Sequence, residues 1–89
     1  MEDFGKMNAE IIKTRLEKLR ALMSERKLDA FVLIVDERAN SESCHYISGF
    51  RGSSAALIID KNQEILITDG RYLTQSKQQS PFKIVIQSE

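Results

Sequence analysis

The sequence predicts a single α/β domain with a mixed β-sheet and flanking helices. Three observations predict this class: an amphipathic helical stripe precedes an entirely apolar strand, a short turn separates two further strands, and a short helical segment leads into a fourth strand. A helical connection between consecutive strands normally makes them parallel, so the third and fourth strands are expected to pair in that way. The chain has 89 residues, enough for one domain with one modest core.

The first helix is predicted to begin after Asn8, a suitable N-cap, and to stop near Lys27. Its apolar side chains recur at steps of four, three and four residues: Ile12, Leu16, Leu19 and Met23. Charges of both signs occupy most of the other positions, which indicates a helix packed on a protein core and not on a membrane. No glycine follows it, so Lys27 is expected to be strained at the helix end.

Ala30–Val35 is apolar at every position and rich in β-branched residues. This pattern predicts a strand buried on both faces, in the middle of a sheet covered by helices on both sides. Residues 36–43 are polar without a period, which predicts an exposed loop. Residues 46–54 then predict a loop of small residues flanked by aromatic side chains, around which the other elements are arranged.

Residues 55–60 and 64–68 predict a β-hairpin, because Asn62 in the connection tolerates a left-handed turn. Asp69 is expected to cap a short helix over residues 71–79.

Pro81 ends that helix and permits a new strand. In the strand that follows, Phe82, Ile84 and Ile86 alternate with Lys83, Val85 and Gln87, as in a half-covered strand near a sheet edge.

The composition excludes several classes of function. Thirteen basic and thirteen acidic residues give a net charge of zero, which argues against a nucleic-acid binder and gives no support for a membrane-surface protein. One histidine and one cysteine are too few for a zinc site, and the glycine spacing does not fit a phosphate-binding loop. The lone Cys44 fits a reducing compartment, so a cytoplasmic protein is expected.

Two clusters carry the candidate functional residues. Phe50 and Arg51 have two interpretations. They form a contact surface in which Arg51 holds a carboxylate, or Phe50 packs into the core while Arg51 faces solvent. His45 is the only histidine available as a base, and its alternative is a structural role. Arg71 and Tyr72 either contact a ligand or subunit, or Arg71 pairs with a nearby carboxylate while Tyr72 packs under the hairpin.

Four segments in series resemble the N-terminal domain of the creatinase/prolidase/aminopeptidase P family of metallopeptidases. The segments are Arg-Leu-Glu-Lys-Leu-Arg at 15–20, Leu-Asp-Ala-Phe-Val-Leu at 28–33, Tyr-Ile-Ser-Gly-Phe-Arg-Gly-Ser at 46–53 and Ile-Thr-Asp-Gly-Arg-Tyr at 67–72. The last segment is most similar to that of the Xaa-Pro aminopeptidases. The resemblance implies a mixed-sheet, ribonuclease H-like layer.

The resemblance also implies a function. In the family, a separate C-terminal catalytic domain of the pita-bread fold holds two divalent metal ions, often manganese, and hydrolyses the bond before proline. The N-terminal domain helps to build the dimer or tetramer and shapes access of proline-containing peptides to the active site. Its residues nearest to the substrate-contacting positions are Phe50 and Arg51. A chain without the catalytic domain is expected to be inactive and to need that domain and a second subunit as partners.

The sequence departs from the family pattern in three places. Lys27 stands where many relatives have glycine, the loop at residues 38–44 is longer than the common short turn before the segment at 46–53, and the sequence ends after the fourth predicted strand. We therefore expect residues 1–10 to form a lead-in and residues 11–89 an incomplete domain, with an open sheet edge through which the chain dimerises. Two alternatives stay open: a stand-alone α/β module that binds a protein or a small ligand, and a small enzyme that uses His45, Cys44 or Arg71.

Overall fold

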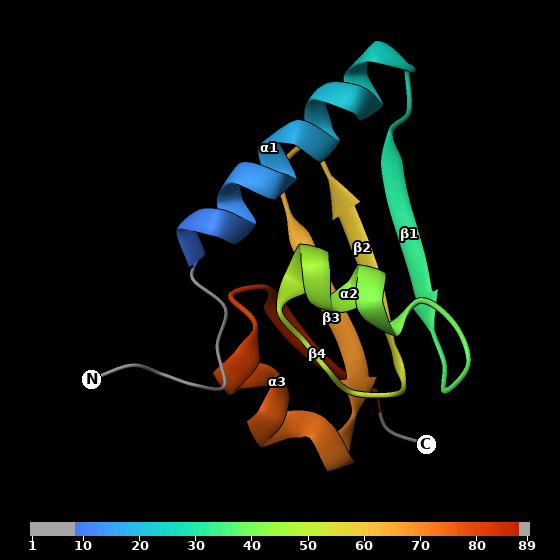
Figure 1. The fold of residues 1–89 in the computed structure, drawn as a ribbon, viewed down its shortest axis with the longest axis vertical. Coiled ribbons are helices and arrows are strands. Elements are labelled where there is room, and N and C mark those ends of the chain that lie inside the picture. The colour runs from blue at the N-terminus through green and yellow to red at the C-terminus, as the bar shows by residue number, and fades with distance from the viewer. Residues whose placement is uncertain (1–8, 88–89) are drawn as a thin grey trace.

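The computed structural model describes residues 9–87 as a four-stranded sheet with three α-helices and one 3-10 turn (Figure 1). The elements are α1 (Ala9–Glu25), β1 (Ala30–Val35), α2 (Ser41–Ser48), β2 (Ala55–Asp60), β3 (Glu64–Asp69), η1 (Gly70–Tyr72), α3 (Leu73–Gln79) and β4 (Lys83–Gln87). The strand order is β1-β2-β3-β4, in which only the β3–β4 pair is parallel. The α/β class with a mixed sheet is confirmed.

The core lies between the sheet and α1 and α2, which cross the same face (Figure 1). Alternate residues of each strand point to that face, and the register aligns Leu33, Leu57, Leu66 and Ile84 in one row across the four strands. Leu57 and Leu66 are completely buried. From α1, Ile12, Leu16 and Met23 close the core, so the predicted apolar stripe is confirmed.

The helix α1 begins at Ala9, inside the range predicted as a lead-in, and the predicted cap Asn8 lies outside the described residues. At its other end, Lys27 has a φ of 60°, as expected for a helix end without glycine. The backbone N–H of Leu28 donates to the carbonyl of Met23 at 2.8 Å, which closes the helix end. Lys27 therefore occupies a conformation that glycine adopts with less strain.

Arg20 fixes α1 to the hairpin between β2 and β3. Its guanidinium donates to the carbonyl oxygens of Asp60 at 2.7 Å and Gln63 at 3.0 Å, and to the Glu64 carboxylate at 2.6 Å. The hairpin itself, the capping role of Asp69 and the parallel β4 strand agree with the sequence predictions.

The prediction for Ala30–Val35 was wrong in one respect. The segment is a strand, but it lies at the edge of the sheet, and helices cover only one of its faces. Val32 and Ile34 on the other face are 57% and 59% exposed. An unbroken apolar run cannot distinguish a strand covered on both faces from one whose second face is apolar but uncovered.

The prediction of a loop over residues 36–43 was also wrong, because α2 begins at Ser41 and extends to Ser48. The buried residues of α2 are Cys44 and Ser48. Their small side chains do not form the apolar stripe by which a buried helix is recognised in a sequence. Asn40 at the start of α2 has a φ of 72° and Gly49 at its end has a φ of 86°. The loop expected at residues 46–54 is therefore shorter in the structure and spans residues 49–54.

Candidate functional site

The candidate site is built on residues 49–54, which connect α2 to β2 and are called the 49–54 loop here. Gly49 ends α2 in the left-handed conformation and donates from its N–H to the carbonyl of His45 at 2.9 Å. The Ser48 hydroxyl donates to the Cys44 carbonyl at 2.7 Å and accepts from the N–H of Phe50 at 3.2 Å. The start of the loop is thus fixed by the last turn of α2.

Phe50 anchors the middle of the 49–54 loop in the core. Its side chain is 0% exposed and meets the ring of Tyr72 edge to face, with centroids 5.5 Å apart. A methyl group at Gly52 would lie only 2.2 Å from Cζ of Phe50, so the backbone passes the ring at a distance that only glycine allows. Phe50 has no exposed surface with which to touch a ligand, in keeping with the core alternative for this side chain.

Side chains from three other elements hold the rest of the loop. The N–H of Arg51 donates to Oε1 of Gln79 at 2.9 Å, which joins the loop to α3. The hydroxyls of Ser53 and Tyr72 are 2.8 Å apart, and the hydrogen bonds with Ser53 lower the pKa of Tyr72. Thr68 Oγ1 donates to the carbonyl of Ser54 at 2.7 Å. The loop backbone is therefore fixed at both ends and in the middle.

The side chain of Arg51 is exposed and lines a cavity of about 350 Å³ together with Ser41, Glu42 and His45. Burial lowers the pKa of His45 below its usual value, and the positive charges of Arg51 and Arg15 lower it further. The lining combines one guanidinium group, that of Arg51, with the carboxylate of Glu42 and the imidazole of His45. Arg51 is the group of this cavity that can hold a carboxylate through charge-assisted hydrogen bonds.

Arg15 links the first of the four segments to this site. Its Nη1 donates to the carbonyl of Tyr46 at 2.6 Å, and its Cζ lies 3.8 Å from the centroid of the Tyr46 ring. The guanidinium of Arg15 is held on α2, one residue from His45. The positive charges of Arg15 and Arg51 both lower the pKa of His45.

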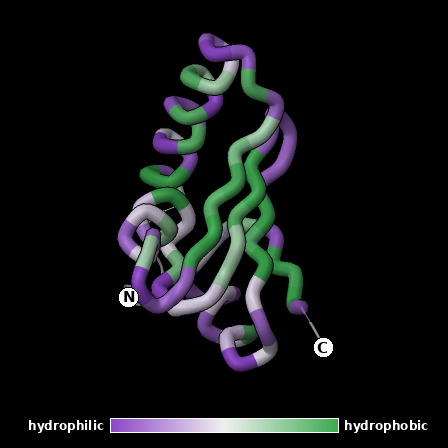
Figure 2. Tube along the Cα trace, turned by 90° about the vertical axis from the view of Figure 1, so that its right-hand side faces the viewer, coloured by the Kyte–Doolittle hydropathy of each residue, from purple (hydrophilic) through white to green (hydrophobic). Residues whose placement is uncertain are grey.

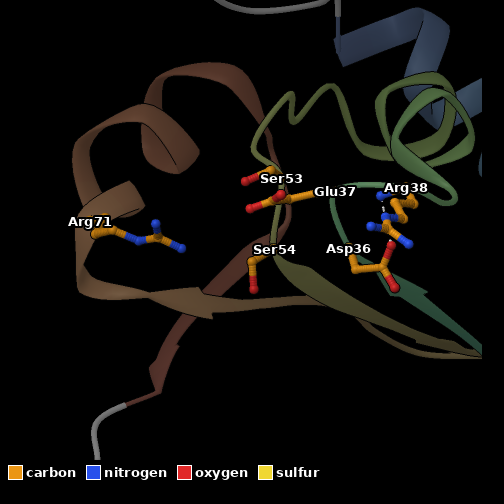
Figure 3. A pocket seen from close by; sticks show the side chains of 6 residues that line it. All are labelled: Asp36, Glu37, Arg38, Ser53, Ser54 and Arg71. Atoms are coloured by element: carbon orange, nitrogen blue, oxygen red, sulfur yellow. Dashed lines mark hydrogen bonds between the residues drawn. The ribbon is translucent and has the colours of Figure 1, made fainter.

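A second cavity, of about 440 Å³, is lined by both acidic and basic side chains (Figure 3). Its lining residues come from the segment that follows β1, the 49–54 loop and η1: Asp36, Glu37, Arg38, Ser53, Ser54 and Arg71. Figure 3 shows Arg71 across the cavity from Asp36 and Arg38. The guanidinium of Arg71 in this cavity is already paired with the carboxylate of Asp69, which makes the cavity a weaker candidate than the one at Arg51.

Arg71 is paired with the carboxylate of Asp69 through two hydrogen bonds of 3.0 Å. These bonds and the N–H of Arg71 lower the pKa of Asp69. The side chain of Arg71 is 67% exposed, so the pair lies in water. Tyr72 packs against the ring of Phe50 and hydrogen-bonds to the hydroxyl of Ser53.

The structure thus divides the five candidates into three groups. His45 and Arg51 line one cavity, Phe50 and Tyr72 form a packed aromatic pair beneath the 49–54 loop, and Arg71 lines the second cavity. The sequence did not predict two residues of the site: Glu42, which lines the cavity with His45, and Gln79, which binds the backbone of the 49–54 loop. Neither residue belongs to a recognisable motif.

The nucleophile and metal alternatives gain no support from the geometry. Cys44 is completely buried, and this burial raises the pKa of its thiol, which keeps it protonated. Within residues 9–87, no three side chains of His, Cys, Asp or Glu lie together as metal ligands would. No helix in the same part of the chain has the length and apolar character needed to cross a bilayer.

Comparison with known proteins agrees with this description of the fold. Residues 15–89 match the creatinase/prolidase N-terminal domain. The probable Xaa-Pro aminopeptidase P of Aspergillus niger is 40% identical over 72 residues, which are 73% of this chain and 12% of that protein. The crystal structure of an X-Pro aminopeptidase from Thermotoga maritima has a TM-score of 0.77 at 39% identity, with 81% of this chain and 20% of that chain covered.

A third relative is the X-prolyl aminopeptidase of Caenorhabditis elegans, described as a cytosolic enzyme with a di-nuclear active site. It matches with a TM-score of 0.77 at 26% identity, over 88% of this chain and 16% of its own. The present chain therefore corresponds to less than a quarter of each of these three larger peptidase chains. It belongs to the creatinase/prolidase N-terminal domain family and is homologous to Xaa-Pro aminopeptidase P.

Proposed function

We propose that this chain acts as the non-catalytic N-terminal domain of a metal-dependent Xaa-Pro peptidase, which hydrolyses the bond before proline in peptides. The domain contributes to oligomer assembly and shapes the entrance to an active site that lies on a catalytic domain. Two divalent metal ions, which we take to be manganese, activate water in that catalytic domain. The cytosolic location of the Caenorhabditis elegans relative supports a cytoplasmic protein.

The cavity at Arg51 is the observation that carries this proposal. Arg51 is exposed on a loop whose backbone is held by Gln79, Ser53 and Thr68. The backbone of Arg51 is therefore fixed, which limits the positions that its guanidinium group can reach. His45 lines the same cavity of about 350 Å³. In this role, Arg51 binds the carboxylate of a short peptide through charge-assisted hydrogen bonds, and His45 limits the space beside it.

The remaining candidates act indirectly in this proposal. Phe50 and Tyr72 pack together beneath the 49–54 loop and fix its position, and the Arg71–Asp69 pair faces a neighbouring domain or subunit. None of the five residues carries out the hydrolysis. The 89-residue chain alone is therefore expected to show no peptidase activity, with or without manganese.

A chimera tests the proposal. The present chain would replace the matching segment of the Thermotoga maritima X-Pro aminopeptidase, and hydrolysis of Xaa-Pro peptides would be followed with manganese present. We expect the chimera to assemble and to hydrolyse these peptides, whereas the isolated chain does not. A correctly folded chimera that binds metal but lacks activity on every Xaa-Pro peptide would contradict the proposal.

The alternative is a stand-alone module that binds a protein or a small ligand, and an uncovered apolar sheet face favours it. An antibody against this chain separates the two on an immunoblot of source cells. A native band several-fold heavier than 10.2 kDa supports the peptidase domain, and a band at 10.2 kDa supports the separate module.

A further inference from the structure

The cavity at Arg51 carries two opposite charges. Arg51 supplies a guanidinium group from the 49–54 loop, and Glu42 supplies a carboxylate from the first turn of α2. The rest of the lining is the hydroxyl of Ser41 and the imidazole of His45. Figure 2 shows the longest hydrophobic stretches in the strands, none of which contributes to this lining. The groups that decide what the cavity binds are therefore polar and charged.

Both charges are free to pair with a ligand. In the second cavity, by contrast, the guanidinium of Arg71 is held by the carboxylate of Asp69 at 3.0 Å. Within residues 9–87, the side chains of Glu42 and Arg51 form no ion pair or hydrogen bond with each other or with a third residue. Hydrogen bonds to a charged group are roughly twice as strong as those between neutral groups. A ligand can therefore gain two strong contacts here without breaking an existing pair.

The surroundings of Glu42 leave its charge in place. His45 follows Glu42 by three residues on α2, so the two side chains lie on the same side of the helix. Burial and the positive charges of Arg51 and Arg15 lower the pKa of His45, so its imidazole is neutral at pH 7 and does not cancel the carboxylate. A negative charge in the first turn is also favourable to α2 itself.

The two charges match the end of a peptide whose last residue is basic. This step depends on the proposed function, in which Arg51 binds the carboxylate of a short peptide, here the terminal one. A cavity of about 350 Å³ is small for a ligand site and has room for about one residue. The side chain of the terminal residue then shares the cavity with Glu42. A lysine or arginine side chain gains an ion pair there, whereas an acidic side chain is repelled.

We propose that Glu42 makes this cavity selective for peptides that end in lysine or arginine, with the terminal carboxylate on Arg51 and the basic side chain on Glu42. A peptide that ends in an apolar residue keeps only the contact with Arg51. Glu42 and Arg51 act on binding and touch no reacting atom, so they determine specificity and neither is a catalytic residue.

NMR titration of the 89-residue chain with short peptides tests this selectivity without a catalytic domain. The probes are Ala-Pro-Lys, Ala-Pro-Ala and Ala-Pro-Glu with free terminal carboxylates, and Ala-Pro-Lys amide. We expect dissociation constants in the millimolar range, with Ala-Pro-Lys bound about threefold to fivefold more tightly than Ala-Pro-Ala. Ala-Pro-Glu should bind most weakly of the free acids. The amide should bind more weakly than Ala-Pro-Lys, because it lacks the carboxylate for Arg51.

Three variants assign the selectivity to one side chain. Glu42→Gln removes the charge and keeps the size of the side chain, so Ala-Pro-Lys and Ala-Pro-Ala should bind equally. Glu42→Lys should reverse the order and favour Ala-Pro-Glu. Glu25→Gln removes a carboxylate from an exposed position on α1 outside the cavity, and this matched control should bind the peptides as the unaltered chain does. Glu42 is exposed, so both substitutions there fit the fold, and amide chemical shifts confirm it.

Four results would overturn the inference. They are no binding of Ala-Pro-Lys at ~10 mM, equal binding of the three free acids, a lysine preference that persists in Glu42→Gln, or an amide that binds as tightly as the free acid. The activity of the chimera is measured separately. An active chimera whose domain does not discriminate terminal lysine contradicts this inference and leaves the proposed function intact. An inactive chimera with a lysine-selective domain contradicts the proposed function and supports the selectivity of the cavity.

Discussion

Gly52 is the position at which the structure makes its sharpest prediction. A methyl group there would lie 2.2 Å from Cζ and 2.5 Å from Cε2 of Phe50, whereas ordinary contacts begin near 3.4 Å. The ring would have to move by 3.4 − 2.2 = 1.2 Å. It is completely buried and packed edge to face on Tyr72, so it cannot move without disturbing the core.

Gly52→Ala is therefore expected to destabilise the fold by about 2–3 kcal/mol, in the upper part of the range for an overpacked core. Gly70→Ala is the matched control, because a methyl group at Gly70 meets no atom within 4 Å. Neither glycine has a positive φ, so the backbone alone does not require glycine at either position. The control is expected to change stability by less than about 0.5 kcal/mol.

Equilibrium urea unfolding, followed by circular dichroism at one fixed protein concentration, measures both variants. If Gly52→Ala and Gly70→Ala unfold within 0.5 kcal/mol or so of each other, the argument from the Phe50 contact is wrong. Phe50→Leu provides a further check, since a smaller side chain should relieve the clash. The double variant should then lose less stability than the two single losses added together.

Three further predictions concern other parts of the chain. Lys27→Gly should stabilise the fold by about 0.5–1 kcal/mol in urea unfolding, because glycine adopts a φ of 60° without strain, and no gain would contradict this account of the helix end. Arg20→Ala should cost about 1–2 kcal/mol in the same assay, since it leaves the partly buried Glu64 unpaired, and Arg26→Ala is the neutral control. His45 should titrate below its usual pKa by NMR, and stability should fall as pH drops below the unfolded pKa of ~6.5, because the unfolded chain binds the proton first. His45→Gln should reduce that pH dependence, and a titration at or above the usual value would contradict the reasoning.

The elements that the sequence predicted well are those with a strong period or a specific turn residue. The stripe of α1, the hairpin with Asn62 and the cap at Asp69 each depend on contacts a few residues apart, which a local pattern reports. The strained Lys27 followed from the absence of glycine at a helix end. These features are determined by neighbouring residues, so the rest of the fold has little effect on them.

The errors occur where distant parts of the chain decide the outcome. The position of β1 at the sheet edge depends on pairing with β2, twenty to thirty residues away, and its apolar residues would fit either position. The helix α2 buries a thiol and a hydroxyl, which a search for apolar periodicity passes over. Nothing local in the sequence indicates that Phe50 lies within reach of the Tyr72 ring.

The candidate site was predictable only in part for the same reason. The residue types in the 49–54 loop indicated a close backbone approach and an exposed arginine. The sequence did not indicate that Gln79 holds the loop or that Glu42 and His45 share a cavity with Arg51. Those contacts bring together residues from three elements, and only the fold places them side by side.

The central claim is that the 49–54 loop presents Arg51 to the carboxylate of a peptide substrate. The most direct measurement is the KM of the chimera for a short Xaa-Pro peptide with Arg51→Ala, compared with Arg26→Ala as a control for lost surface charge. Loss of one charge-assisted contact should raise KM about tenfold or more, with kcat nearly unchanged. Equal KM values for the two variants would contradict the claim and leave Arg51 as a solvent-exposed side chain without a role in binding.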